Sequence, residues 1–401
     1  MNTEEKAFPR QLLMQPAIER FNYFKEKIID HARLHEVDEK IMHAIRYPSG
    51  ASLIIVYGPT GVGKTTLRKK IEEKLLQQEL KAMEEDPGYM PVAGMHLIAE
   101  SRSFSWKEYS IRAMTALNEP LIDRKADFET RKIYQGREVI KSSNPSEPTL
   151  RRAMESCFKH RRTKVFIIDE AQHLKNIGSG RKLLNQMDTI KSLAETTNTI
   201  YVLIGTYELL DLTNLSAQLC RRSTEIHFSR YLNDGGTDSD AFASALKTFQ
   251  QHLPLVQTPD LSCFEDYLYR ETFGCIGMLK GLLNKTLSYA LENEAETITK
   301  EMLEQCTLST RDLVKMSQEI SAGEDVLKKT DEQVNALNKF LLPVPRVKKK
   351  SKAKEQETSN TPEKKADSKQ EELVRSLSSQ KRNVGERGPK RDKVGVGKNA
   401  G

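Results

Sequence analysis

The sequence predicts an α/β fold in which a parallel sheet is covered by helices, followed by a small all-α domain and a disordered basic tail. Short, wholly apolar runs alternate with helical periods up to Arg230, as is typical of a parallel sheet covered on both faces. After Arg230 only helical periods follow. The tail beyond residue 342 contains no Phe, Tyr, Trp, Ile or Met, so it lacks the residues that build a core.

Four regions follow from these changes along the chain. We expect an N-terminal helical segment (residues 1–50), an α/β core (51–232), a helical domain (233–342) and the tail (343–401). The tail holds 17 Lys or Arg and 8 Asp or Glu, so it carries the basic charge of a chain whose net charge is +7. Three interpretations stay open: it binds nucleic acid, it carries a docking segment such as residues 371–380, or it is simply solvated.

The core elements are expected in strand, loop and helix order. Apolar β-rich runs mark the strands and 3.6-residue periods mark the helices. Residues 118–150 are polar and contain three prolines, so they are expected to form a connection with one helix at 131–140. The expected strands are 53–57, 95–99, 165–168 and 200–204, and the expected helices are 67–83, 107–117 and 182–196.

Several classes of protein are excluded by composition. The longest apolar runs are of strand length, so we expect no membrane span. The first residues, MNTEEKAFPR, are acidic where a secretory signal is basic, which favours a cytoplasmic protein. The five cysteines lie far apart without a CxxC pair, so neither a disulfide nor a zinc knuckle is expected.

A phosphate-binding loop follows the first strand. The segment GPTGVGKT matches GxxxxGK[ST] and lies between a predicted strand and a predicted helix, as this motif requires. Backbone N–H groups and the helix N-terminus hold phosphate oxygens in such loops, while Lys64 reaches the terminal phosphates and the Thr65 hydroxyl binds Mg²⁺. The predicted nucleotide-binding residues here are Gly58, Pro59, Thr60, Gly61, Val62, Gly63, Lys64, Thr65 and Thr66.

Two carboxylates end the strand Val165–Ile168. Asp169 is predicted to hold Mg²⁺ together with Thr65, and Glu170 to polarise an attacking water. An apolar strand that ends in acids is common, but after a phosphate-binding loop it is a strong signal. No NKxD segment for reading guanine is present, so we predict ATP and Mg²⁺ as cofactors and ATP hydrolysis as the reaction.

Two further positions are candidates for catalysis. Thr206 follows the strand Ile200–Ile204, where its hydroxyl can orient a hydrolytic water; an ordinary turn threonine is an equal alternative. Arg221 and Arg222 follow a helix, and one of them is the candidate arginine finger for a neighbouring subunit. The residues alone do not choose between the two arginines, and surface charge remains the alternative.

These motifs together resemble the AAA+ ATPases of the initiator branch. More narrowly, the chain resembles the TnsC/TniB transposition regulators of Tn7-like elements. The residues that carry the resemblance are the phosphate-binding loop, the segment Phe104–Tyr109, the run Asp169–His173 and the GxIGxLxxLL pattern at Gly274–Leu283. The resemblance covers about residues 20–315. It implies an AAA+ P-loop NTPase core with a helical lid at 233–342, in which Lys280 is the candidate second sensor for the nucleotide.

The resemblance also implies a function and partners. Such proteins assemble on double-stranded DNA as homo-oligomeric rings or filaments and link a target-selection protein to a transposase, with ATP hydrolysis driving disassembly. The implied DNA contacts map to Arg102, Ser103 and Lys107, while Trp106 is expected to pack in the core. The sequence departs from the family at Lys280, where a lysine offers a point charge instead of a fork.

Two other functions remain open from the sequence. A replication initiator or helicase loader uses the same ATPase residues and is the nearest alternative. A signalling AAA+ ATPase with a protein partner is the second. ATP-dependent DNA binding with a steep salt dependence is expected of a transposition regulator and of a replication initiator or helicase loader, and not of the signalling ATPase.

Overall fold

The computed structural model describes residues 7–48, 50–98, 104–125, 131–134, 137–140, 145–175, 181–213, 222–328 and 331–341. By its contacts the chain divides into Met1–Gln333 and Val334–Gly401. The first unit contains the sheet and the helical lid, and the helix α14 (Asp331–Leu341) crosses the boundary between the units. The basic tail and the candidate docking segment 371–380 lie outside the described residues.

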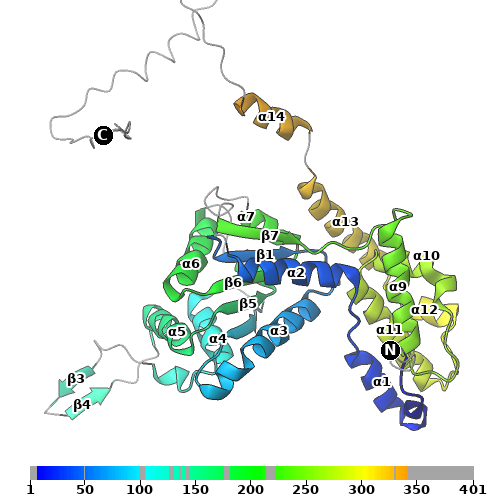
Figure 1. Cartoon of the computed structure of the whole chain (residues 1–401), viewed down its shortest axis with the longest axis horizontal. Helices are drawn as coiled ribbons and strands as arrows, with labels where there is room; N and C mark the ends of the chain where they lie inside the picture. Colours follow the sequence, from blue (N-terminus) through cyan, green and yellow to red (C-terminus); the bar gives the residue numbers. More distant parts are fainter. Residues whose placement is uncertain are drawn as a thin grey trace, which may run out of the picture. The chain divides into compact units, whose positions relative to one another are not determined.

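A five-stranded parallel sheet forms the centre of the first unit, in the order β2-β5-β6-β1-β7 (Figure 1). The strands are β1 (Leu53–Tyr57), β2 (Val92–His96), β5 (Val165–Asp169), β6 (Ile200–Gly205) and β7 (Ser223–His227). Strand β1 pairs with β6 on one side, Leu53 opposite Tyr201, and with β7 on the other, Leu53 opposite Ser223. Because β6 lies between β1 and β5, the loops that follow these three strands meet at one edge of the sheet.

Helices cover both faces of this sheet, as the continuous apolar strands predict. Alternate residues of β1 serve opposite faces: Leu53, Ile55 and Tyr57 join one buried cluster, and Ile54 and Val56 join the other. The first face is covered by α4 (Trp106–Ala116), α5 (Glu147–Arg161) and α6 (Arg181–Thr197), and the second by α2 (Ala32–Arg46) and α3 (Lys64–Glu85) (Figure 1).

The lid is a separate helical cluster that follows β7. It contains α9 (Thr237–His252), α10 (Glu265–Thr272), α11 (Ile276–Glu292) and α12 (Lys300–Cys306). The helix α1 (Ala17–Glu26) belongs to the same cluster, because Phe24 is fully buried there and the Arg20 Nε donates to the Pro254 carbonyl at 2.9 Å. Since α2 packs on the sheet, the segment 1–50 is divided between the lid and the core.

The expected helix at 131–140 is wrong. The structure has two antiparallel strands there, β3 (Arg131–Tyr134) and β4 (Arg137–Ile140), which pair with each other. Ile133, Tyr134, Val139 and Ile140 are β-branched or aromatic residues that favour strands. The spacing of apolar residues was compatible with both structures over so short a stretch.

The helices at the end of the lid region also differ from expectation. The spacing of apolar residues predicts one helical stretch at 300–316, but the structure has two helices there. The helix α12 ends at Cys306, and α13 (Thr310–Leu327) begins after Ser309, whose hydroxyl accepts from the Asp312 N–H at 3.2 Å. Short 3-10 turns complete the fold: η2 (Arg10–Met14), η3 (Ile122–Arg124), η5 (Ala171–Lys175), η6 (Tyr207–Leu209) and η7 (Leu261–Phe264), with the short helix α7 (Leu210–Thr213). Among the described residues, no helix has the length and apolarity to span a membrane.

Candidate active site

The phosphate-binding loop leaves β1 and enters α3, as predicted. Gly61 and Gly63 have φ angles of +78° and +117°, in the left-handed region that glycine tolerates best. At Gly58 a Cβ would lie 2.2 Å from the Phe228 carbonyl oxygen. Because the N-cap of α3 is Gly63, no side chain caps the first turn of that helix, and its N–H groups are available to an anion.

The amine of Lys64 lies inside this loop. Its Nζ donates to the carbonyls of Pro59 at 2.8 Å and Gly58 at 3.2 Å. Burial lowers the pKa of the Lys64 amine, and the nearby Glu170 carboxylate opposes that shift. A phosphate group beside this amine would add negative charge to that of the nearby carboxylate and further stabilise the protonated amine.

Thr65 and Asp169 meet across the site. The Thr65 Oγ1 donates to Asp169 Oδ2 at 3.3 Å, and Asp169 is fully buried at the end of β5. A hydroxyl and a carboxylate are oxygen ligands of the kind that Mg²⁺ prefers. Two side chains that sequence reasoning missed lie near the same carboxylate oxygen: the Arg68 guanidinium, with Nη1 at 4.0 Å, and the His96 imidazole, with Nδ1 at 3.9 Å.

Glu170 has an unusual backbone conformation. Its φ is +55°, and its N–H donates to Asp169 Oδ1 at 3.0 Å. A non-glycine residue in this region costs about 1–3 kcal/mol and is enriched at functional sites. The Glu170 carboxylate accepts a hydrogen bond from the Gln172 Nε2, a residue to which the sequence analysis gave no role.

Thr206 follows β6 and so lies between the two halves of the site. Its N–H donates to the Gln172 Oε1 at 3.2 Å. Within the described part of the chain, its buried Oγ1 has no hydrogen-bond partner. An unpartnered buried hydroxyl, an uncapped helix N-terminus and a buried lysine amine together fit a magnesium-bound triphosphate.

The lid contacts the phosphate-binding loop through the start of α11. The Met278 N–H donates to the Gly61 carbonyl at 3.0 Å, and a Cβ at Gly277 would lie 2.5 Å from the same oxygen. Lys280, two residues further on, donates from Nζ to the Phe24 carbonyl and lies 3.4 Å from the centre of the Phe24 ring. Burial lowers the pKa of this amine to about 7.

A cavity of about 120 Å³ lies beside Lys280. Its walls include Gly63 and Thr66 of the phosphate-binding loop, His31 of the α1–α2 connection and Ile276 of the lid. Lys280 therefore lies at the lid side of the site, with its amine bonded to α1. Its role as a second sensor stays a prediction.

The other candidates lie apart from this site or outside the described residues. Arg102, Ser103 and Arg221 fall outside them. Arg222 is exposed and forms an ion pair with Glu195. Lys107 lies half-buried in the first turn of α4, and the Trp106 ring packs edge-on against Phe104 and Tyr109, each with centroids 5.1 Å apart.

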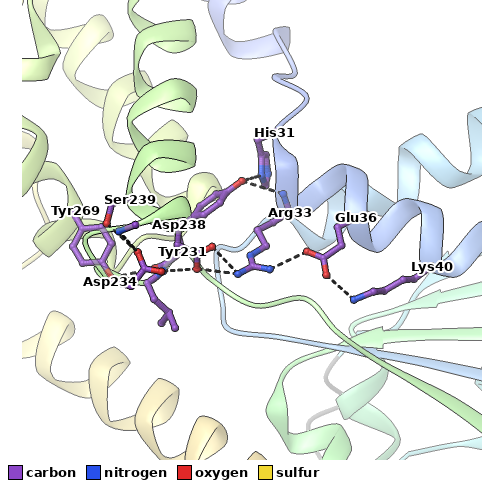
Figure 2. Close-up of polar contacts among 11 residues, drawn as sticks. His31, Arg33, Glu36, Lys40, Tyr231, Asp234, Asp238, Ser239 and Tyr269 are labelled. Carbon is purple, nitrogen blue, oxygen red and sulfur yellow. Dashed lines mark hydrogen bonds and ion pairs between the residues drawn. The ribbon is translucent and has the colours of Figure 1, made fainter.

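A polar network that the sequence analysis missed joins the core to the lid (Figure 2). Arg33 of α2 donates from Nη2 to both oxygens of Asp238 at 2.8 and 2.9 Å, and from Nη1 to Glu36. The Tyr231 hydroxyl lies 3.0 Å from both the Arg33 backbone N–H, which donates to it, and His31 Nδ1. Asp238 Oδ2 also accepts from the Leu232 N–H. These contacts fix the linker between β7 and α9 against α2.

The chain is similar to known AAA proteins over its core. Residues 45–213 match the model of the family described as AAA domain. This match, together with the parallel sheet and the phosphate-binding loop, identifies an AAA+ P-loop fold. No curated protein matches the chain.

Several solved structures are similar to the chain at low identity. The ORC2 protein of Aeropyrum pernix in ADPNP–ADP complexes has a TM-score of 0.47 and 12% identity, covering 79% of this chain and 74% of that one. Drosophila ORC bound to DNA has a TM-score of 0.43 and 12% identity, covering 85% and 86%. Domain III of the Thermotoga maritima replication initiation protein DnaA has a TM-score of 0.41 and 13% identity, covering 73% and 98%. Similarity at this level carries no conclusion about function.

Proposed function

We propose that this protein is an ATPase that binds double-stranded DNA as an ATP-dependent homo-oligomer. The observation that carries the proposal is the convergence of the Lys64 loop, the Thr65–Asp169 pair, Glu170 and Thr206 at the carboxyl ends of three adjacent strands. Phosphoryl transfer depends mainly on positioning and on charge stabilisation, and this set of groups is suited to both.

Each group has a separate task in this proposal. A bound magnesium triphosphate supplies the electrophilic phosphorus and the leaving group. The α3 N-terminus and the Lys64 amine bind its negative charge, and Thr65 with Asp169 holds the metal. The Glu170 carboxylate accepts a proton from water, and the Thr206 hydroxyl orients that water. Met278, through its bond to Gly61, connects the lid to the loop that grips the phosphates.

The finer role is that of a transposition regulator of the TnsC/TniB type. In this role the oligomer marks target DNA and connects a target-selection protein to a transposase, and hydrolysis releases it. Arg221 or Arg222 would reach the neighbouring subunit's ATP, and Arg102, Ser103 and Lys107 would contact phosphates. The proposal for this role rests on the sequence resemblance carried by the phosphate-binding loop, Phe104–Tyr109, Asp169–His173 and the pattern at Gly274–Leu283.

A replication initiator or helicase loader remains the second candidate, because its ATP chemistry needs the same residues. The two roles differ in what the assembled protein recruits. Stimulation of a transposase by the ATP-bound assembly favours the first role, and recruitment of a helicase favours the second. If the protein is a signalling ATPase with a protein partner, we expect neither stimulation of a transposase nor recruitment of a helicase. We also expect no salt-dependent binding to duplex DNA.

Two substitutions test the ATPase proposal. Lys64→Ala removes the cation that binds the phosphates, so we expect ATP hydrolysis to fall by at least about 100-fold and nucleotide affinity to fall with it. Glu170→Gln keeps the shape of the side chain but cannot accept the proton, so we expect a similar loss of hydrolysis with nucleotide binding retained. The measurements are steady-state phosphate release and titration with a fluorescent ATP analogue.

The exposed Lys247 on α9 provides the control, since Lys247→Ala makes the same chemical change far along the chain from the loop. We expect this variant to behave as the wild type in both measurements. Hydrolysis by Lys64→Ala at the wild-type rate would exclude this site as the ATPase centre.

A further inference from the structure

The Gln172 side chain connects two parts of the site that are far apart in sequence. Its Nε2 donates to the Glu170 carboxylate, and its Oε1 accepts from the Thr206 backbone N–H at 3.2 Å. Gln172 is 8% exposed, so few water molecules compete for these bonds. One amide therefore joins the end of β5 to the end of β6.

The surrounding backbone leaves the amide little freedom. A Cβ at Gly205 would lie 2.4 Å from the Gln172 Oε1, so the amide lies directly against the backbone of β6. On its other side, Glu170 is held in the left-handed conformation and begins the turn that carries Gln172 into η5. A strained backbone conformation persists only where the surrounding contacts hold the residue in place. The hydrogen bond from Gln172 to the Glu170 carboxylate is one such contact.

We propose that Gln172 is a positioning residue, which orients the Glu170 carboxylate and ties it to the backbone of Thr206. This inference rests on the proposed ATPase function. A movement of the Thr206 loop is transmitted through the amide to Glu170, so the proton acceptor and the water-orienting residue move together. Gln172 touches neither nucleotide nor water in this scheme.

The chemistry of the amide explains why glutamine is suited to this position. The carboxylate of Glu170 only accepts hydrogen bonds, and the Thr206 N–H only donates one. A side chain between them must donate at one end and accept at the other, which an amide does. Glutamate has the same shape and can accept from Thr206, but when ionised it cannot donate to Glu170. Methionine fills a similar volume and makes neither bond.

Because Met and Glu lose different hydrogen bonds at position 172, these two substitutions distinguish a positioning role of Gln172 from a role in packing alone. Gln172→Met and Gln172→Glu should each lower kcat by roughly 10- to 100-fold, the effect of losing a hydrogen bond to a charged group, with KM within about threefold of wild type. Gln250 provides the control, because its Oε1 likewise accepts a backbone N–H, from Leu261 at 2.9 Å, but in the lid. Gln250→Met and Gln250→Glu should leave kcat unchanged.

A second measurement does not depend on hydrolysis. In the nucleotide-free protein, amide hydrogen exchange at Thr206 should become at least about tenfold faster in Gln172→Met, which lacks the acceptor. In Gln172→Glu the acceptor remains, so exchange at Thr206 should stay near the wild-type rate although kcat falls. The two variants thus test the two ends of the amide separately.

The inference is overturned if both Gln172 variants keep wild-type kcat, or if Gln172→Met leaves exchange at Thr206 unchanged. It is also overturned if kcat falls only in proportion to the unfolded fraction measured by thermal melting, because that result describes a purely structural side chain. A wild-type protein that does not hydrolyse ATP would instead contradict the proposed function, while the exchange experiment would still report whether the Gln172–Thr206 bond exists.

Discussion

His31 is a buried side chain whose contacts stabilise the fold and make that stability depend on pH. Its Nδ1 lies 3.4 Å from the Leu34 N–H at the start of α2, which donates to it, and 3.0 Å from the Tyr231 hydroxyl. The hydrogen bond from the Leu34 N–H, which caps α2, requires an unprotonated Nδ1. Burial lowers the pKa of the imidazole from 6.5 to about 4, so the folded protein resists a proton that the unfolded chain accepts.

This shift predicts a loss of stability in acid. Between pH 6.5 and about 4 the unfolded chain binds the proton at His31 and the folded chain does not, so the free energy of unfolding falls as the pH falls. His31→Asn keeps a capping side chain without a titrating ring, so it should reduce this loss by about 2 kcal/mol. Urea unfolding across this pH range measures it.

The exposed His35 is the matched control, and His35→Asn should leave the acid dependence nearly as in the wild type. Equal pH dependence in all three proteins would show that His31 does not resist protonation.

At the scale of the element, features that one continuous stretch of sequence encodes were predicted, and contacts between residues far apart in the sequence were not. The phosphate-binding loop and the strands β1, β5 and β6 are readable because each is a continuous run of residues with one chemical character. The bonds of Gln172 to Thr206 and of Arg33 to Asp238 join residues 34 and 205 positions apart, and no local pattern marks them. The hairpin at Arg131–Ile140 was missed because its short apolar spacing fits a helix as well.

The Arg33–Asp238 pair should be the main polar contact between α2 and the first turn of the lid helix α9. Asp238→Asn removes the charge that compensates Arg33, and with side chains 27% and 13% exposed we expect a loss of about 1–2 kcal/mol, between the values for surface and buried pairs. Glu36→Gln breaks the more exposed contact of the same arginine and should cost less than about 0.5 kcal/mol. Denaturant unfolding of both variants measures the two losses in the free energy of unfolding. Equal losses would show that the Asp238 contact contributes no more to stability than the Glu36 contact.

At the scale of the whole first unit, the lid and the core meet around the nucleotide loop. The chain passes between them at residues 27–31 and again at 228–236, and Met278 bonds to Gly61 where the two parts meet. A nucleotide bound between these parts would change the contacts of both, which provides a route from ATP binding to assembly. The sequence analysis treated residues 1–50 as one helical segment and did not place α1 with the lid, because the Phe24 contacts come from helices more than 200 residues later.

The most direct test of this account is the mass of the wild-type protein on duplex DNA, measured by mass photometry with Mg²⁺ and a non-hydrolysable ATP analogue. We predict complexes of several copies with the analogue, single copies without it, and affinity that falls steeply between about 50 and 200 mM salt. A protein that stays monomeric and unbound with saturating analogue would contradict the central claim that ATP controls assembly on DNA.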